Sequence, residues 1–218
     1  EMIWVEPGTF TMGSPSSETG RGSDENEHNV TLTNGFYLGK YEVTQAQYEA
    51  VMNGNSEGLN AKPSQWPNND DRPVEKVSWE DAQVFLSRLN SIEQTAGRLP
   101  NGWKYVLPTE AEWEYACRAG TTSAYGFGER IRSTQGSYSE QVSYEARPTR
   151  KVGSGSSNRW GLYDMHGNAW EWCQDYFGPY PSGSVTNPTG PSSGTHHVLR
   201  GGSSSMLAVD CRSAVRGE

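Results

Sequence analysis

The sequence NRWGLYDMHGNAWEW, from Asn158 to Trp172, combines three tryptophans, two glycines and two acids. Trp170 and Trp172 are two residues apart, so in a β-strand both indoles point to the same face. Gly161 and Gly167 indicate turns or close backbone approaches. Four polar side chains are interleaved with these residues: Asp164, His166, Asn168 and Glu171. The pattern indicates either an oxygen-lined cation site or a polar network that fixes the core.

This segment resembles the signature of the formylglycine-generating-enzyme (sulfatase-modifying factor) domain family, whose fold is a variant of the C-type lectin fold. Five further segments resemble the family in the expected order: WVEPGTFTMGS at Trp4–Ser14, YEVTQAQYEAVM at Tyr41–Met52, RPVEKVSWEDAQVFLSRLN at Arg72–Asn90, LPTEAEWEYACRAGT at Leu107–Thr121, and VLRGGS at Val198–Ser203. The resemblance implies an α+β fold with short antiparallel sheets, two or three helices and long ordered loops, in one domain over residues 1–218. Because one fold can host unrelated activities, function has to be inferred from the site residues.

The composition excludes several classes of protein. The chain has 218 residues with 33% hydrophobic and 11% aromatic residues and 25 glycines, which indicates one domain with an aromatic core and many ordered turns. A net charge of −8 argues against a nucleic-acid partner, because phosphate binding requires an excess of Lys and Arg. No apolar run approaches the roughly 20 residues of a membrane span. The three cysteines are far apart and indicate neither a disulfide framework nor a zinc site.

Three helices are predicted from their N-terminal capping residues. Thr44 is the expected N-cap of a short helix within Glu42–Met52. Ser78-x-x-Asp81 and Thr109-x-x-Glu112 resemble capping boxes. Apolar residues at helical spacing follow the first box: Ala82, Phe85, Leu86, Leu89 and Ile92. The second box is expected to open a helix over Glu110–Arg118, with inward-facing and closing residues Trp113, Ala116 and Gly120.

Short strands are predicted from alternating and β-branched residues. Met2–Phe10 alternates apolar and polar residues, and His197–Arg200 is also expected to be a strand. Val30–Leu32 and Phe36–Leu38 are expected to flank a tight hairpin at Asn34-Gly35.

Long loops connect these elements. Ser14–Asn29 is rich in polar and charged residues and is predicted to be exposed. Thr121–Ser157 lacks a regular pattern, and a loop of this length is either functional or held by its own side chains. Four aromatic residues favour the second possibility: Tyr125, Phe127, Tyr138 and Tyr144.

The family resemblance implies a calcium site in the signature. In the family, such a site takes a side-chain oxygen, two backbone carbonyls and a glutamate from this segment. The matching groups are the Asp164 side chain, the carbonyls of Gly167 and Ala169, and the Glu171 side chain, and oxygen ligands of this kind suit Ca²⁺. Alternatively, Asp164 and Glu171 accept hydrogen bonds from turn amides without a metal. A second calcium site found in some members requires an Asp-Gly-aromatic run, which Arg147–Ser157 lacks.

Catalysis of the family type is predicted to be absent. The formylglycine-generating enzymes bind copper(I) through two cysteines five residues apart, shortly after Gly-Gly-Ser. Counted from Gly201-Gly202-Ser203, the second position is Cys211 and the first is Met206. A thioether cannot ionise to a thiolate, the soft ligand that suits copper(I). The sequence therefore predicts no copper and no catalytic residues. An iron-dependent branch of the family uses histidines on a helical domain that this sequence does not contain.

The C-terminal segment keeps part of the family pattern and departs from the rest. The matching positions are Gly201, Gly202, Ser203, Ala208, Cys211, Arg212, Ser213, Ala214 and Arg216. The departing positions, where the family commonly has asparagine or an adjoining tryptophan, are Ser204, Ser205, Met206, Leu207, Asp210, Val215 and Gly217. Change at asparagine positions resembles the variable proteins of diversity-generating retroelements, in which adenine-directed mutagenesis rewrites asparagine codons on a lectin-fold scaffold. The alternative is ordinary drift at exposed loop positions.

The leading interpretation is a non-catalytic protein that binds a ligand through a variable region over residues 198–218, above an aromatic floor around Trp160 and Trp170. The predicted ligand-binding residues are Ser204, Ser205, Met206, Leu207, Val209, Asp210, Val215 and Gly217. Apolar members cluster among them, and exposed apolar clusters tend to mark binding surfaces. The competing interpretation is an enzyme, either an atypical oxidase that uses Cys211 alone or an accessory sulfatase-modifying factor.

The expected ligand is a protein or a surface glycan. Surface display in the family implies a protein at the cell surface or secreted, and any lipid anchor would lie outside this chain.

Overall fold

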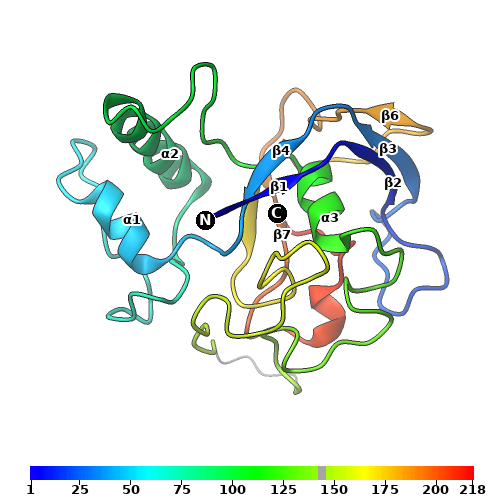
Figure 1. The fold of residues 1–218 in the computed structure, drawn as a ribbon. Coiled ribbons are helices and arrows are strands. Elements are labelled where there is room, and N and C mark those ends of the chain that lie inside the picture. Colours follow the sequence, from blue (N-terminus) through cyan, green and yellow to red (C-terminus); the bar gives the residue numbers. More distant parts are fainter. Residues whose placement is uncertain (142–145) are drawn as a thin grey trace.

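The computed structural model describes residues 1–141 and 146–218, which form three α-helices, a 3₁₀ helix and seven short strands (Figure 1). The helices are α1 (Gln45–Met52), α2 (Trp79–Thr95), α3 (Glu110–Arg118) and the 3₁₀ helix at Ala208–Cys211. The strands are β1 (Met2–Val5), β2 (Gly8–Met12), β3 (His28–Leu32), β4 (Phe36–Gly39), β5 (Glu171–Tyr176), β6 (Val185–Thr186) and β7 (His197–Arg200).

The strands form three small sheets around α3. β1 pairs with β4, β5 pairs with β7, and both pairs are antiparallel. β3 lies between antiparallel β2 and parallel β6. α1 and α2 pack together on one side, whereas α3 lies among the sheets (Figure 1). The architecture confirms the predicted small α+β fold with long connecting segments.

The three capping predictions are confirmed. Thr44, Ser78 and Thr109 are N-caps, and each forms a reciprocal capping box with the residue three positions later. The predicted bounds of α3 and its closing glycine are also confirmed: the helix spans Glu110–Arg118, Ala119 is the C-cap at φ +45°, and Gly120 follows at φ +84°. Within the apolar repeat of α2, Phe85 is buried and packs in a cluster with Tyr48 and Met52 of α1, whereas Ile92 is 42% exposed.

The hairpin prediction at Asn34-Gly35 is wrong. β3 pairs with β2 and β4 pairs with β1, so the chain passes from one sheet to another between them. Gly35 has no side chain to collide with Trp4 and the Val5 carbonyl, both of which it approaches closely. The single strand predicted over Met2–Phe10 is divided into β1 and β2 on either side of Pro7, which has no N–H to donate to a sheet.

The main core is built around Trp113 of α3, which is 0% exposed and packs with Leu162, Met165, Cys173 and Val198. The paired tryptophans of the signature are only partly buried. Trp172 donates its indole N–H to the Val77 carbonyl at 3.0 Å and so links β5 to the start of α2. The fully buried indole is therefore on a helix rather than in the signature.

Two loop predictions have different outcomes. Ser14–Asn29 is not wholly exposed, since Ser14 and Glu25 are 1% and 3% exposed. Within Thr121–Ser157, Tyr125 is buried and donates its hydroxyl to the Ala208 carbonyl, and Tyr138 donates to the Ile131 carbonyl. These contacts agree with aromatic anchoring of the segment. Tyr144 lies outside the described residues.

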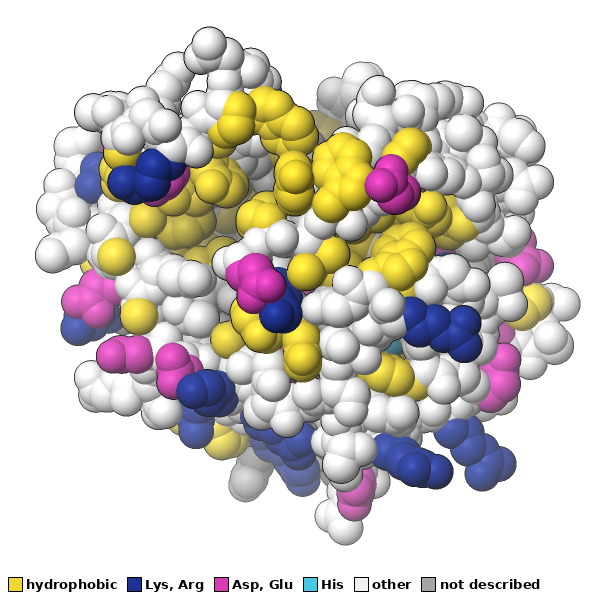
Figure 2. Space-filling model, viewed as in Figure 1, with side chains coloured by type: hydrophobic (Ala, Val, Ile, Leu, Met, Phe, Trp, Pro, Cys, Tyr) yellow, Lys and Arg dark blue, Asp and Glu magenta, His cyan; other side chains and the backbone are white. Residues whose placement is uncertain are grey.

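Hydrophobic side chains gather over β1 and β4 on the face in Figure 2. There Trp4, Tyr37 and Trp103 are 41–50% exposed, and Tyr37 contacts the other two rings at centroid distances of 5.0 and 5.5 Å. The outward face of this two-stranded sheet is therefore aromatic. None of the described helices is both long and apolar enough to cross a bilayer.

Candidate functional site

The C-terminal segment follows β7 and lies across segments that are distant in the sequence. The Ser204 amide donates to the Asn168 carbonyl at 3.0 Å, and the Ser204 hydroxyl donates to the Arg147 carbonyl at 2.9 Å. The Arg147 amide donates in turn to the Ser205 hydroxyl at 2.7 Å. The Ser139 amide donates to the Met206 carbonyl at 2.7 Å. These bonds fix the backbone of the segment through main-chain groups and the two serine hydroxyls. They do not involve the side chains of Met206 and Leu207.

Arg200 anchors this segment from beneath. Its guanidinium is fully buried, pairs with Glu114 of α3, and donates to the carbonyls of Ser213 and Ala214, each at 2.9 Å. It also donates to the Val215 carbonyl at 2.6 Å. Because a buried charge needs charged and polar partners, this ion pair and these three hydrogen bonds hold the chain after Cys211 in place, although Arg200 Nε has no hydrogen-bond partner among the described residues.

Two further arginines extend the anchor. Arg212 donates to both carboxylate oxygens of Glu25 at 2.9 Å, pairs with Glu18, and donates to the Gly20 carbonyl at 2.6 Å. Arg216 donates to both carboxylate oxygens of Glu110, at 2.6 and 2.9 Å. Arg212 therefore explains why Glu25 is buried in a loop predicted to be exposed. Composition alone could not reveal these pairs.

The eight predicted ligand-binding residues lie together on this segment, but they are less exposed than expected. Ser204 is only 6% exposed, because its hydroxyl is used to hold Arg147. Gly217 bridges to Leu199 of β7 and lies against the Trp170 ring. Val209 packs against Gly20. The remaining members are partly exposed: Ser205, Met206, Leu207, Asp210 and Val215.

The two tryptophans predicted to form an aromatic floor under the segment, Trp160 and Trp170, have different surroundings. Trp170 does lie beneath the segment, at Gly217. Trp160 instead packs edge-on against Tyr115 of α3, with ring centroids 4.9 Å apart.

The signature turn brings several oxygens together. Asp164 and Asn168 both have positive φ, at +60° and +70°, which bends the chain sharply around Gly167. The Ala169 carbonyl and a Glu171 carboxylate oxygen each lie 3.8 Å from the point where a side chain on Gly201 would begin. Neither the Gly167 nor the Ala169 carbonyl receives a hydrogen bond from the other described residues outside regular strands. The two main-chain carbonyls of the predicted ligand set are therefore without a backbone donor among the described residues outside the strands.

The fourth predicted calcium ligand, Asp164, already has a hydrogen-bond partner in the protein. Its carboxylate accepts a hydrogen bond from the Gly153 amide at 2.6 Å, which is the structural role considered as the alternative. Burial raises its pKa. Burial also raises the pKa of Glu171 to about 7, with a contribution from the charge of Asp164. The Trp113 indole N–H faces Glu171, yet it makes no hydrogen bond with acceptable geometry.

A third carboxylate, that of Glu42, completes this group and was not predicted. It accepts from the Asn168 side-chain amide at 2.5 Å and from the Ala169 amide at 2.9 Å. Burial, followed by the charges of Asp164 and Glu171, raises its pKa well above the usual value. No Lys or Arg in the described part of the chain pairs with any of these three acids. Clustered acids without a basic partner are compensated either by proton uptake, which the raised pKa values favour, or by a bound cation.

Coordination of a metal ion at the signature turn would depend on main-chain oxygens. Within residues 1–141 and 146–218, no three His, Cys, Asp or Glu side chains converge as metal ligands do. A cation at the turn would therefore need main-chain oxygens such as the carbonyls of Gly167 and Ala169 to complete its coordination.

The cysteine position lacks an activated thiol. Cys211 is buried, and its thiol donates a long hydrogen bond of 3.9 Å to the Ser203 carbonyl. Burial raises the pKa of Cys211 to about 12, so the reactive thiolate is scarce at neutral pH. His166 cannot act as its base, because its Nδ1 lies 2.9 Å from the Cys211 carbonyl and its Nε2 accepts from the Gly126 amide. Burial lowers the pKa of His166 to about 4.

The whole chain, residues 1–218, matches the sulfatase-modifying factor enzyme 1-like domain. It is 28% identical to the formylglycine-generating enzyme of Bos taurus over 93% of the chain, but it spans only 65% of that enzyme. Among solved structures, it resembles Treponema denticola variable protein 1, with a TM-score of 0.79 and 28% identity over 99% of this chain and 88% of that one. It also resembles PvdO from Pseudomonas aeruginosa, with a TM-score of 0.80 and 26% identity over 99% and 87%. These similarities confirm the predicted fold.

Proposed function

The chain belongs to the sulfatase-modifying factor enzyme 1-like domain family. Within this family, we propose that it is a non-catalytic ligand-binding protein with a variable C-terminal surface. The proposal assigns it to the variable proteins of diversity-generating retroelements. Its similarity to the Treponema denticola variable protein supports this assignment.

One observation carries the proposal: burial separates the residues that keep the family pattern from those that depart from it. Most matching positions of the C-terminal segment are buried, namely Gly201, Gly202, Cys211, Arg212, Ser213 and Ala214. Among the departing positions, only Ser204 is buried. Such a distribution is expected if the matching residues support the fold and the departing residues contact a ligand.

This display surface comprises seven partly exposed residues, with Met206, Leu207 and Val215 as its apolar centre: Ser205, Met206, Leu207, Val209, Asp210, Val215 and Gly217. The eighth predicted residue, Ser204, is buried and holds Arg147 instead. We assign this surface a protein or surface-glycan ligand and the chain a location at the cell surface or outside the cell. Arrays of proteins and glycans probed with the labelled domain test this proposal. A ligand that binds the wild type and not a variant with Met206, Leu207 and Val215 changed to serine is the expected result. Ligands that bind both proteins equally would contradict it.

The enzymatic alternative makes a distinct prediction. With copper and a reductant, the protein is expected to leave a cysteine-containing sulfatase peptide unmodified. Met206 supplies no thiolate, and the Cys211 thiol is buried with a pKa of about 12. Mass spectrometry of the peptide is the measurement, with an authentic formylglycine-generating enzyme as the positive control. Formylglycine that is formed by the wild type and lost in Cys211→Ser would establish oxidase activity.

We further propose that the signature turn binds one calcium ion through Glu171, the carbonyls of Gly167 and Ala169, and the nearby Asp164. When bound, the cation would compensate the charge of the partly buried acids, including Glu42. Without it, raised pKa values at Glu42, Asp164 and Glu171 mean that the folded state retains protons which the unfolded state releases. Stability should then fall as pH rises from about 4.5, the usual range for Glu, towards the folded-state pKa of Glu171, about 7.

Added Ca²⁺ is therefore expected to raise the melting temperature more at pH 8 than at pH 5.5. A calcium concentration of about 100 times Kd would add about 2.7 kcal/mol. For a chain of this size, each kcal/mol corresponds to roughly 2–4 °C. Thermal melts with Ca²⁺ and with EDTA are the measurement. Glu171→Gln should abolish the response, whereas exposed Glu57→Gln should retain it. Identical melting points with Ca²⁺ and EDTA at both pH values would show that the acids act without a metal.

A further inference from the structure

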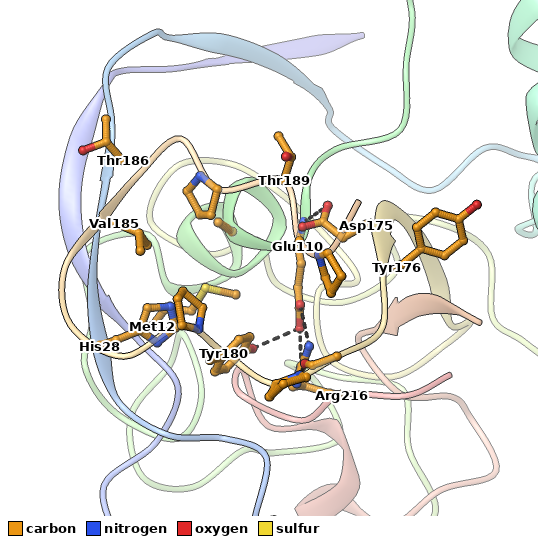
Figure 3. Close-up of a pocket in the computed structure, with 17 residues that line it drawn as sticks. Met12, His28, Glu110, Asp175, Tyr176, Tyr180, Val185, Thr186, Thr189 and Arg216 are labelled. Atoms are coloured by element: carbon orange, nitrogen blue, oxygen red, sulfur yellow. Dashed lines mark hydrogen bonds and ion pairs between the residues drawn. The ribbon is translucent and has the colours of Figure 1, made fainter. Parts of the chain in front are cut away.

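A cavity of about 470 Å³ lies between the start of α3, strands β2 and β3, and the segment 178–191 (Figure 3). Ligand pockets in proteins typically enclose roughly 300–1,000 Å³. None of the eight predicted ligand-binding residues lines it, and neither does the signature turn. The cavity is therefore a candidate site separate from the proposed display surface.

Its walls are stiff and largely apolar. The lining includes four prolines from one segment: Pro179, Pro181, Pro188 and Pro191. Tyr180 lies among them, and its ring is tilted against that of His28 of β3, with centroids 4.6 Å apart. Met12, Ala111, Tyr176 and Val185 supply further apolar and aromatic surface. Proline restricts its own backbone, so this part of the wall needs little ordering when a ligand binds.

The positive charge in the cavity is already neutralised. Arg216 donates to both carboxylate oxygens of Glu110, and Tyr180 donates its hydroxyl to the same carboxylate at 3.0 Å (Figure 3). The remaining guanidinium nitrogen of Arg216 donates to the Gly178 carbonyl at 2.9 Å. The charge of Arg216 is therefore already compensated by Glu110, and the net charge of −8 further disfavours an anionic ligand.

Asp175 remains available on the cavity wall. It is 4% exposed, and one carboxylate oxygen accepts from the Glu110 amide at 3.0 Å. No other residue in the described ranges donates a hydrogen bond to this carboxylate, and none pairs with it as a cation. His28 adds a second acceptor: its Nδ1 lies 3.0 Å from the Asn26 carbonyl, so Nδ1 carries the proton of the neutral ring and Nε2 has a free lone pair.

We propose that the cavity binds a primary alkylammonium group, which donates hydrogen bonds to Asp175 while its alkyl stem lies against the proline and tyrosine walls. A buried carboxylate that lacks a cation is costly, and an ammonium supplies both charge and donors. The inference does not depend on the proposed display function.

The site is expected to be pH-dependent. Burial and the charges of Glu110 and Glu112 together raise the pKa of Asp175 to about 7, against the lowering effect of the hydrogen bond from the Glu110 amide. Alkylammonium binding requires the ionised carboxylate, so affinity should rise from pH 6 to pH 8, where an amine is still protonated. The other titratable or charged groups around Asp175 are Glu110 and Glu112 of α3, His28 of β3, His197 and Arg200 of β7, and Arg216.

The test is a titration of the ¹⁵N-labelled protein with n-pentylammonium chloride, followed at the Glu110 amide, which bonds to Asp175. Asp175→Asn keeps an acceptor for that amide but removes the charge. It should weaken binding at pH 8 by about tenfold or more, as expected for losing a hydrogen bond to a charged group, and should remove the pH dependence. Asp71→Asn, in an exposed ion pair, is the charge-matched control and should bind like the wild type.

Thr189→Trp leaves Asp175 intact and places an indole at the exposed edge of the cavity, so binding should be lost while the fold is retained. Nα-acetyl-lysine methylamide distinguishes the source of the ammonium group. Binding as tight as that of n-pentylammonium would favour a lysine side chain of another protein, and weaker binding would favour a free small amine. Equal affinity for n-pentanol, or unchanged affinity in Asp175→Asn, would overturn the proposal.

Discussion

Replacing Arg200 with methionine is expected to destabilise the domain by about 3–5 kcal/mol, the typical cost of removing one partner from a buried ion pair. Arg200 and Glu114 are both 0% exposed, so the substitution leaves a buried carboxylate with Arg118 as its remaining partner. It also leaves the carbonyls of Ser213, Ala214 and Val215 without their donor. A loss of this size is a large part of the roughly 5–15 kcal/mol that stabilises a typical domain.

Urea unfolding of Arg200→Met and of Arg98→Met provides the comparison. Arg98 pairs with Glu93 at 2.6 Å, but its side chain is 60% exposed, so its loss should cost about 1 kcal/mol or less. The double variant Arg200→Met, Glu114→Met should recover part of the stability, because both charges are removed together. If Arg200→Met unfolds at the same urea concentration as Arg98→Met, then Arg200 does not anchor the C-terminal segment.

Local features of the fold could be predicted from the sequence. The capping boxes at Thr44, Ser78 and Thr109 each depend on residues only three positions apart, so their patterns are visible in a short window. Strand existence was also predicted at β3, β4 and β7. The wrong prediction concerns strand pairing. Asn34-Gly35 has the composition of a hairpin turn, but β3 pairs with β2 and β4 pairs with β1. Pairing depends on the whole core rather than on the turn alone.

The candidate site was predictable only where its residues are close in sequence. The four predicted oxygen donors of the signature turn lie within eight residues, from Asp164 to Glu171. Glu42 contacts the same turn from 126 positions away, and Arg212 reaches Glu18 across 194 positions. Nothing in a single sequence links such pairs. The burial of Ser204 was missed for the same reason, since its partner Arg147 is distant in sequence.

Changing the apolar part of the display surface should weaken ligand binding strongly and lower stability little, whereas changing Arg200 should mainly lower stability. The variant Met206→Ser, Leu207→Ser, Val209→Ser, Val215→Ser removes four side chains that are only partly buried. Individual substitutions at such surfaces usually change stability by about 0.5 kcal/mol or less, so we expect a total loss of about 2 kcal/mol or less. Removal of side chains from the centre of an interface can cost 2 kcal/mol or more, or about 30-fold in Kd.

The most direct test of the display surface measures unfolding and binding side by side. The ligand is one identified on the protein and glycan arrays, and the proteins are the wild type, the fourfold serine variant and Arg212→Met, which lies in the same segment but is buried. A display surface predicts that the serine variant loses binding by about 30-fold or more while remaining folded, and that Arg212→Met loses stability first. If the serine variant unfolds as readily as Arg212→Met, or binds the ligand as tightly as the wild type, the segment is part of the core and does not display a binding surface.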